Sequence, residues 1–209
     1  MPKPTNNART QNDLKILESL LAPILQESFT ERKDSFFALN IACGRADETG
    51  TLLRCLSPLS QSLHLTGIDI RDRELSDARK RWPSTSQADI SFVKHDASKL
   101  KLLSTLPNEV DLVMMRHQNF WNGAETWIRI YDSALKQLSP NGRLIITSYF
   151  DREHRQAVQA ISSLGAQLLH TFQNPRSRVI LKQPLKSIDR HIAVFMRKNE
   201  EQTDLQSVI

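Results

Sequence analysis

The sequence has few of the residues that mark specialised protein classes. Its 209 residues include only 2 cysteines and 6 glycines, and aromatic residues make up 6%. Cys43 and Cys55 are too few for a disulfide framework or a thiolate zinc site, so we expect no metal site and a reducing, cytoplasmic setting. The composition is otherwise ordinary, which excludes collagen-like and disordered chains. One globular domain with a full core fits this length.

Long apolar runs are also missing. The first 12 residues are polar, unlike a secretory signal, and the early apolar segment over residues 20–25 is interrupted by Pro23. That segment is far shorter than the roughly 20 residues that span a bilayer, so we expect no membrane association. The expected organisation is a flexible tail over residues 1–12, one domain over 13–198 that begins with a helix over 13–29, and a flexible tail over 199–209.

Basic residues are concentrated late in the chain. The net charge is +5, and residues 171–198 contain seven bases and one acid, Asp189. Such an excess could favour nucleic acid or an anionic substrate. It equally fits a solvated loop and strand edge, where Lys and Arg prevent edge-to-edge pairing. Few aromatic residues and no nucleic-acid motif accompany these bases, which favours the second interpretation.

Short apolar segments alternate with helical patterns along the chain. This alternation predicts an open α/β sheet with parallel pairing and right-handed crossovers. Two later strands lie close together with no long helix between them, which fits an antiparallel pair. The first five strands are expected over residues 35–42, 63–70, 90–95, 110–115 and 143–150, and the last two over 167–172 and 188–196.

Suggestive residues follow the first three strands. Ligands of open α/β sheets bind at the carboxyl ends of the strands. After the first strand, small residues around Gly44 precede a helix, whose free N–H groups favour an anionic group. Asp69 after the second strand could accept the hydroxyls of a ribose, and Asp96 after the third could accept an adenine amino group. Each aspartate could instead cap the helix that follows it. Together they favour a cofactor that carries ribose and adenine.

Five segments of this sheet resemble the class I S-adenosylmethionine-dependent methyltransferases. The resemblance spans about residues 35–196 and implies a Rossmann-like sheet of order 3-2-1-4-5-7-6, with strand seven antiparallel and helices on both faces. The chain departs from the family at Asn40, where an acid is frequent, and at Ala42 and Ala46, where glycine is frequent. Alanine fits such a turn where its φ is negative. The segments are ALNIACGRAD at 38–47, TGID at 66–69, FVKHD at 92–96, VDLV at 110–113 and LSPNGRLII at 138–146.

The resemblance implies S-adenosyl-L-methionine as the cofactor and assigns residues to its parts. The loop over residues 42–46 would face the methionine part, and Arg45 would either pair with its carboxylate or point to solvent. Asp69 would bind the ribose hydroxyls. The implied cofactor-binding residues are Asn40, Ala42, Cys43, Gly44 and Arg45 at the first strand, Asp69 and Ile70 at the second, Asp96 and Ala97 at the third, and Met115 and Arg116 at the fourth.

The acceptor should lie beyond the fourth strand. Methyl transfer depends on alignment, and an oxygen or nitrogen nucleophile must also lose a proton. His117 is therefore the candidate base, with Asn119 and Trp121 as substrate-orienting groups, although His117 and Trp121 could simply pack over the next helix. His154 is a second candidate base or a surface residue. No Asn/Asp-Pro-Pro-aromatic tetrad follows the strand, which disfavours that route to nucleobase amino groups.

These observations predict a methyltransferase that acts on an oxygen or nitrogen atom of a small molecule. One alternative is a non-catalytic binding module, motivated by Asn40, Ala42 and Ala46, in which side chains would fill the space above Gly44. The other alternative is an RNA methyltransferase that uses the basic stretch over residues 176–190.

Overall fold

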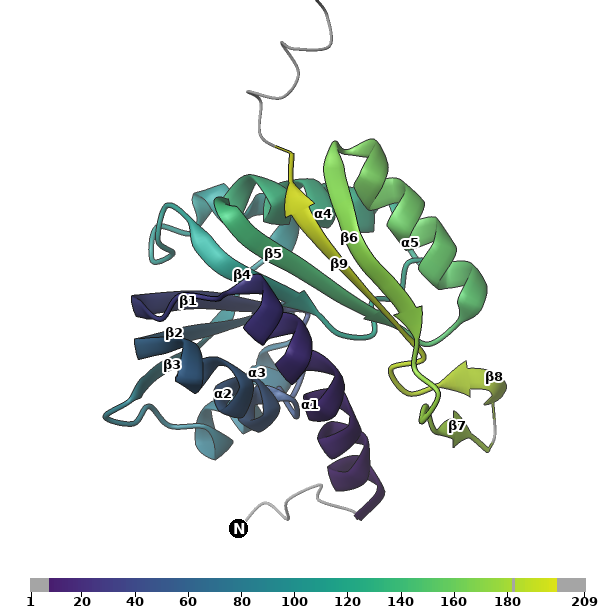
Figure 1. Cartoon of the computed structure of the whole chain (residues 1–209), viewed down its shortest axis with the longest axis horizontal. Helices are drawn as coiled ribbons and strands as arrows, with labels where there is room; N and C mark the ends of the chain where they lie inside the picture. The colour runs from purple at the N-terminus through teal and green to yellow at the C-terminus, as the bar shows by residue number, and fades with distance from the viewer. Residues whose placement is uncertain (1–7, 182, 199–209) are drawn as a thin grey trace, which may run out of the picture.

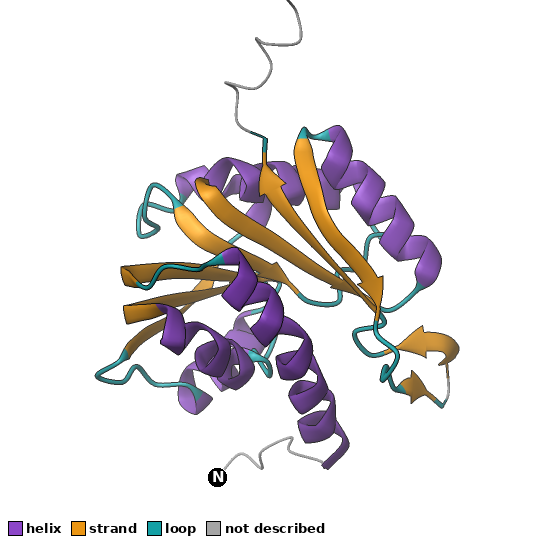
Figure 2. Cartoon of the chain, in the orientation of Figure 1, coloured by secondary structure: helices purple, strands orange, loops and turns teal. Residues whose placement is uncertain are grey.

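Seven strands form one open sheet with the order β3-β2-β1-β4-β5-β9-β6. The computed structural model describes residues 8–181 and 183–198 and places helices on both faces of this sheet (Figures 1 and 2). β9 is antiparallel to both β5 and β6, whereas the other neighbouring strands are parallel. The strand order and the single antiparallel strand confirm the Rossmann-like sheet expected from the sequence.

Helices alternate with the strands for most of the chain. None of the helices within the described ranges is both long enough and apolar enough to span a membrane. The helices are α1 (Ala8–Ser28), α2 (Thr49–Leu56), α3 (Asp72–Arg81), α4 (Ala124–Gln137) and α5 (Asp151–Ser163), with short 3-10 helices η1 (Ser57–Leu59) and η2 (Ala97–Leu102). The strands are β1 (Lys33–Ile41), β2 (Ser60–Asp69), β3 (Ala88–Lys94), β4 (Val110–Met115), β5 (Leu138–Ser148), β6 (Ala166–Gln173), β7 (Val179–Ile180), β8 (Gln183–Ser187) and β9 (His191–Arg197).

Each face of the sheet buries its own apolar core. α1 and α2 cover one face, where Leu17 and Leu52 are buried against strand residues such as Ala38. α4 and α5 cover the opposite face, where Tyr131 packs with strand residues such as Leu39. The central strands are covered on both sides and are mostly apolar, and several of their polar residues, among them Asn40, Asp69 and Ser148, lie near the carboxyl ends of the strands.

The first helix begins earlier than the sequence suggested. The expected tail over residues 1–12 is wrong for residues 8–12, because α1 starts at Ala8. Asp13, the first residue of the expected helix, lies inside α1, and its carboxylate accepts a hydrogen bond of 2.9 Å from Arg178 Nε. Residues 1–7 and 199–209, the remainder of the two expected tails, lie outside the described residues.

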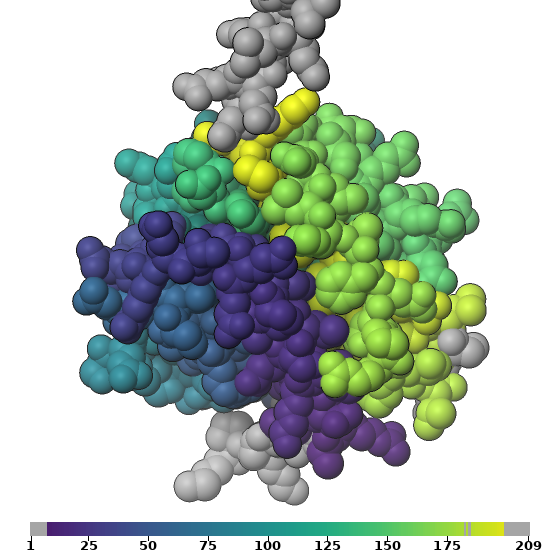
Figure 3. All heavy atoms as spheres, in the orientation of Figure 1, coloured from purple at the N-terminus to yellow at the C-terminus, as the bar shows by residue number. Residues whose placement is uncertain are grey.

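A small two-stranded sheet projects beside the main one. β7 and β8 pair antiparallel in the segment between β6 and β9. This hairpin is tied to the first helix, because Arg178 bonds Asp13 and Arg176 Nη2 donates to Ser19 Oγ at 2.5 Å. Figure 3 shows the yellow-green surface of this segment against the purple surface of α1. The first helix and the segment just before β7, which are far apart in the sequence, therefore meet on one side of the molecule.

Candidate functional site

The turns after the first three strands meet at one edge of the sheet. The backbone N–H of Gly44 donates to Asp69 Oδ2 at 2.7 Å. The N–H of Cys43 donates to the carbonyl of Ile68 at 3.1 Å, and that of His95 donates to the carbonyl of Asp69 at 3.1 Å. Parallel pairing thus brings the loop after β1, the acid after β2 and the start of the turn after β3 together.

The loop after β1 has the backbone of a glycine-rich turn. Its φ angles are +54° at Ala42, +53° at Gly44 and +53° at Ala46. The negative φ with which alanine would fit this turn is therefore absent at both Ala42 and Ala46. The left-handed conformation costs an L-residue about 1–2 kcal/mol. The hydrogen bonds of the surrounding turn hold the two alanines in a strained shape that glycine adopts freely.

Asp69 is buried and surrounded by donors. It is 4% exposed, and its carboxylate accepts from the N–H of Gly44 and from both the backbone and the side chain of Arg71. Burial alone would raise the pKa of Asp69, but the hydrogen bonds from Arg71 and Gly44 outweigh it and lower that pKa. Asp69 is thus an ionised acceptor. Ile70, the next residue, is 67% exposed and offers an apolar surface beside it.

Two side chains cover Gly44. Arg71 Nη1 lies 2.8 Å from Glu74 Oε1, and a Cβ added to Gly44 would meet Glu74 Oε2 at 2.8 Å and Arg71 Nη2 at 3.0 Å. This arrangement is what the binding-module alternative anticipates above Gly44. The Arg71 side chain is 55% exposed, however, so its guanidinium can turn into solvent without loss of core packing.

Other residues assigned to the first and third strand ends have partners within the protein. Arg45 Nε lies 3.7 Å from Asp77 Oδ2 of α3. Cys43 is buried, and its burial raises the pKa of the thiol. Asp96 Oδ1 accepts from the backbone N–H and the hydroxyl of Ser98, so it caps η2, and these bonds lower the pKa of Asp96. Ala97 is buried behind it.

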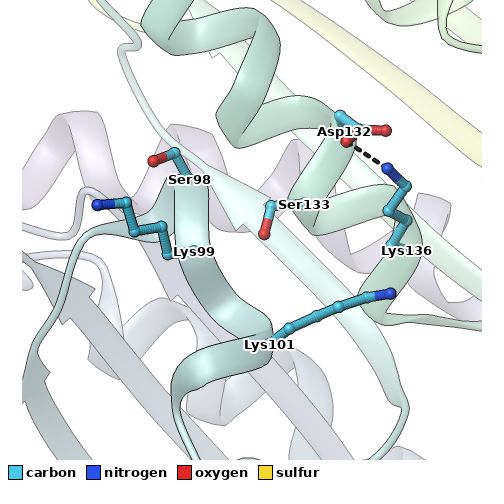
Figure 4. Close-up of a pocket in the computed structure, with 6 residues that line it drawn as sticks. All are labelled: Ser98, Lys99, Lys101, Asp132, Ser133 and Lys136. Carbon is cyan, nitrogen blue, oxygen red and sulfur yellow. Dashed lines mark hydrogen bonds and ion pairs between the residues drawn. The ribbon is translucent and has the colours of Figure 1, made fainter.

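A cavity of about 220 Å³ lies between η2 and α4 (Figure 4). Its lysines give it a positive character, although Lys136 Nζ lies 2.6 Å from Asp132 Oδ2. The cavity includes Ser98 and thus borders the Asp96 cap. It is lined by Ser98, Lys99, Lys101, Asp132, Ser133 and Lys136.

A buried charge cluster follows β4. Arg116 donates to Asp189 through Nε at 3.0 Å and Nη2 at 2.7 Å, and its Nη1 lies 3.5 Å from Glu48 Oε2. Burial alone would lower the pKa of Arg116, but the two carboxylates outweigh it and hold that pKa above its usual range. Met115, just before it, is fully buried in the core. Arg116 therefore joins β4, α2 and the start of β9.

His117 contacts the same aspartate, Asp189. Its Nε2 lies 2.8 Å from Asp189 Oδ1 and 3.1 Å from the backbone nitrogen of Asp189, and its ring stacks on Tyr149 with centroids 3.9 Å apart. Burial lowers the pKa of His117, so the ring is neutral at pH 7. The two tautomers of the neutral ring differ in these contacts: with the proton on Nε2 the ring donates to the carboxylate and Nδ1 is the acceptor, and with the proton on Nδ1 the Nε2 atom accepts from the backbone N–H of Asp189.

Aromatic side chains line the same strand ends. Trp121 stacks on Phe150 with centroids 4.9 Å apart, and Phe150 lies edge-on to Tyr149 at 6.3 Å. Trp121 is 47% exposed, and its Nε1 donates to Gln156 at 2.8 Å. Asn119 is exposed on the same loop. The loop after β4 and the end of β5 thus form a row of aromatic rings next to His117.

His154 is buried and does not lie on the surface. Its Nδ1 lies 3.0 Å from Ser148 Oγ and its Nε2 lies 2.9 Å from Thr171 Oγ1. Burial lowers the pKa of His154 to about 4. Because both ring nitrogens are occupied, His154 fits a structural role between β5, α5 and β6.

Sequence reasoning missed three charged residues of the site: Glu48, Arg71 and Asp189. A signal for Asp189 was present, because it lies at the amino end of the strand over residues 188–196 that was expected to be antiparallel. The amino end of an antiparallel strand lies beside the carboxyl ends of its parallel neighbours. Glu48 and Arg71 lack such a signal, since either could have been a solvated residue at the start of a helix.

Comparison with known proteins places this geometry in a family. A model described as "Methyltransferase domain" matches residues 33–198. The chain belongs to this family. Methyltransferases of this fold use S-adenosyl-L-methionine, so membership implies that cofactor. A comparison with curated protein sequences found no significant match.

Solved methyltransferase structures share the fold. An S-adenosylmethionine-dependent methyltransferase from Clostridium acetobutylicum is 11% identical with a TM-score of 0.65, over 88% of this chain and 92% of that one. An rRNA methylase from Streptococcus thermophilus is 14% identical with a TM-score of 0.60, over 86% and 95%. DesVI from Streptomyces venezuelae is 12% identical with a TM-score of 0.63, over 89% and 92%. At these identities the likeness shows the fold alone.

The strand ends of this methyltransferase domain offer the chemistry that the cofactor requires. Asp69 is an ionised acceptor for hydroxyl groups, and Ile70 is an exposed apolar residue for a ring face. Asn40 is 1% exposed, and its Oδ1 has no hydrogen-bond partner among the described residues. A ligand with hydroxyls, an aromatic base and a cationic amine fits this set.

Proposed function

We propose that this methyltransferase domain transfers the methyl group of S-adenosyl-L-methionine to an oxygen or nitrogen atom of a planar small molecule. The observation that carries this proposal is the row of rings from His117 through Tyr149 and Phe150 to the exposed Trp121. Such a surface favours a flat, apolar acceptor, because stacked rings bury large apolar areas with defined geometry. It lies at the strand ends where ligands of open α/β sheets bind.

In this proposal the first half of the sheet holds the cofactor. Asp69 accepts the ribose hydroxyls once Arg71 has turned away, and Ile70 covers one face of the base. Asp96 faces the adenine amino group through the part of its carboxylate that Ser98 does not occupy. The loop over residues 42–46 faces the methionine part. When bound, S-adenosyl-L-methionine supplies an electrophilic methyl group on a sulfonium.

The second half of the sheet acts on the acceptor. In the tautomer that carries its proton on Nε2 and donates to Asp189, His117 Nδ1 takes the proton of the attacking oxygen or nitrogen. The carboxylate then stabilises the positive charge that the ring acquires. Asn119 and Trp121 orient the acceptor against the ring row. Alignment of this kind can lower the barrier by about 7–11 kcal/mol.

The basic stretch gives little support to the RNA alternative. Arg178 is paired with Asp13 and Arg190 is paired with Asp151, so both charges are used within the protein. Lys186 Nζ lies 4.2 Å from the centroid of the Tyr149 ring. Lys182 lies outside the described residues. The described bases therefore fit the attachment of the β7–β8 hairpin better than a nucleic-acid surface.

A labelled-methyl assay tests the proposal. The protein is incubated with methyl-labelled S-adenosyl-L-methionine and a panel of phenols, heteroaromatic amines and total RNA, after mass spectrometry of the purified protein for a co-purifying adenosyl ligand. We expect label on a ring compound. His117→Ala should lower turnover while calorimetric binding of S-adenosylhomocysteine persists, and His170→Ala, an exposed histidine of β6, should change neither.

Three results would contradict the proposed function. Absence of binding by the wild type at millimolar ligand would exclude the cofactor site. Label on RNA alone would favour the RNA alternative. Full turnover by the His117 variant would remove that residue from the mechanism.

A further inference from the structure

We infer that Glu48, together with Asn40, forms the anionic subsite that holds the ammonium group at the amino-acid end of the cofactor. This inference rests on the proposed cofactor site and adds a charged residue to it. Asn40 stands where the family frequently has an acid, so the first strand itself supplies no charge. Glu48, eight residues later, precedes the first residue of α2.

The two side chains form one buried unit. Asn40 Nδ2 donates to Glu48 Oε1 at 2.6 Å, and the residues are 1% and 5% exposed. The carboxylate therefore orients the amide, because Nδ2 is the atom bonded to Glu48 and Oδ1 is left without that partner. That oxygen has no partner within the described part of the chain. A buried acceptor without a donor is costly, so this position calls for a ligand N–H.

The charge of the cluster points to a cation. Glu48 and Asp189 carry two carboxylates, and Arg116 between them carries one guanidinium. His117 adds no charge, because burial keeps its pKa below the usual value. One negative charge therefore remains uncompensated in the interior. A buried net charge is unfavourable unless a counter-charge arrives, and a ligand ammonium provides one.

Glu48 also has room for a further donor. Arg116 prefers Asp189, with contacts of 2.7 and 3.0 Å, and reaches Glu48 only at 3.5 Å. Glu48 Oε1 accepts from Asn40, and a carboxylate offers about four lone-pair positions. An ammonium between Asn40 Oδ1 and Glu48 would satisfy both acceptors at once. The pair thus replaces the single acid of the family pattern with a neutral acceptor and a charge supplied from the next helix.

Two ligands that differ only at the amino-acid end separate this role from a structural one. S-adenosylhomocysteine carries the ammonium, whereas 5′-methylthioadenosine keeps the nucleoside and lacks the amino-acid end. For Glu48→Gln, calorimetry should show binding of S-adenosylhomocysteine weakened about tenfold or more, because a charge-assisted contact is lost. Binding of 5′-methylthioadenosine should stay within about twofold of the wild-type value, because no contact to it is removed.

Moving the charge back to the first strand is the decisive variant. The double variant Asn40→Asp with Glu48→Gln keeps the total charge and the hydrogen-bonded pair, so we expect it to recover most of the discrimination between the two ligands. Asp47→Asn is the matched control, because Asp47 is the neighbouring acid and pairs with Arg81 of α3. If Glu48→Gln does not fold, Asn40→Ala should still lower the affinity ratio, since it removes the unpartnered oxygen.

The outcomes are distinct. Equal weakening of both ligands by Glu48→Gln, or no weakening of either, would overturn the inference. A double variant that folds but does not discriminate would overturn it as well. A wild-type protein that binds 5′-methylthioadenosine and prefers it to S-adenosylhomocysteine would overturn the ammonium subsite and leave the nucleoside site standing. Failure of the wild type to bind either ligand would refute the proposed cofactor site as well.

Discussion

The Arg71 guanidinium lies across the Asp69 carboxylate, with hydrogen bonds of 3.0 Å from Nε to Oδ1 and 3.1 Å from Nη2 to Oδ2. These are the oxygens that ribose hydroxyls would use, so Arg71 and the cofactor compete. Arg71→Ala should therefore tighten binding of S-adenosylhomocysteine. The gain should be up to about fivefold, because partly exposed ion pairs contribute at most about 1 kcal/mol. Isothermal titration calorimetry measures this change in affinity.

Arg73→Ala provides the control for this competition. Arg73 is an exposed cation in the first turn of α3, two residues from Arg71, so its removal changes the local charge by the same amount. Binding should stay at the wild-type value. Weaker binding by Arg71→Ala than by wild type would mean that Arg71 contacts the ligand, and the idea of competition would be abandoned.

The two alanines of the loop after β1 should respond differently to glycine. Ala42 is exposed with φ +54°, so Ala42→Gly should raise the free energy of unfolding by about 0.5–1 kcal/mol through relief of backbone strain. Ala46 has φ +53° but is fully buried, and loss of its methyl group offsets the relief. Urea denaturation of both glycine variants measures these changes. The control is Ala160→Gly in α5, which should lower the free energy of unfolding. Destabilisation by Ala42→Gly would contradict the strained turn.

Asp189 should be a major determinant of stability. Asp189→Asn keeps a residue that tolerates the observed φ of +47° and removes the charge. Arg116 then retains only the 3.5 Å contact to Glu48, and we expect the free energy of unfolding to fall by about 3 kcal/mol, as for a broken buried ion pair. Asp132→Asn, at an exposed pair with Lys136, should cost less than about 1 kcal/mol. Equal effects in denaturant unfolding would argue against the buried cluster.

His154 should make the fold sensitive to mild acid. Its pKa is about 4 in the folded protein because it is buried, whereas an exposed histidine titrates near about 6.5. Between these values the unfolded chain binds more protons, so stability is full above the higher pKa and declines as pH falls toward the lower one. His191, whose ring stacks 4.7 Å away, disfavours the charge, and Asp151 favours it. Between about pH 7 and about pH 5 the free energy of unfolding should fall by on the order of 2 kcal/mol.

Denaturant unfolding at about pH 7 and about pH 5 measures this dependence. His154→Gln keeps an amide that can bond Ser148 and Thr171. This variant should reduce the slope of the free energy of unfolding against pH. A residual slope of the same sign should remain, because burial also lowers the pKa of His117. An unchanged slope in the His154→Gln variant would mean that another group titrates.

The fold was predictable because local patterns suffice for it. Apolar runs of strand length alternate with helical patterns, and the short connection before the final strand indicates its antiparallel pairing. Boundaries were less predictable, since they depend on partners far along the chain. The sequence pattern predicts a helix that begins at Asp13, yet this residue bonds Arg178 and lies inside α1. Contacts with residues far along the chain therefore determine where this helix begins.

The site was predictable where the backbone alone brings residues together. The contact between Gly44 and Asp69 follows from parallel pairing of β1 and β2. Side-chain conformations do not follow from the pattern, so the placement of Arg71 over Gly44 was not foreseen. The positive φ of Ala42 was not foreseen either, because propensity favours the opposite sign and the surrounding turn overrides it.

The insertion of β9 between β5 and β6 has a consequence for synthesis on the ribosome. β6 emerges before β9, yet its neighbour in the sheet is β9. Asp189, which neutralises Arg116, also emerges only with that late segment. A nascent chain that stops short of it carries an unpaired strand edge and an unneutralised guanidinium. The acceptor half of the domain should therefore assemble in one late cooperative step, and stalled chains should engage chaperones through this half first.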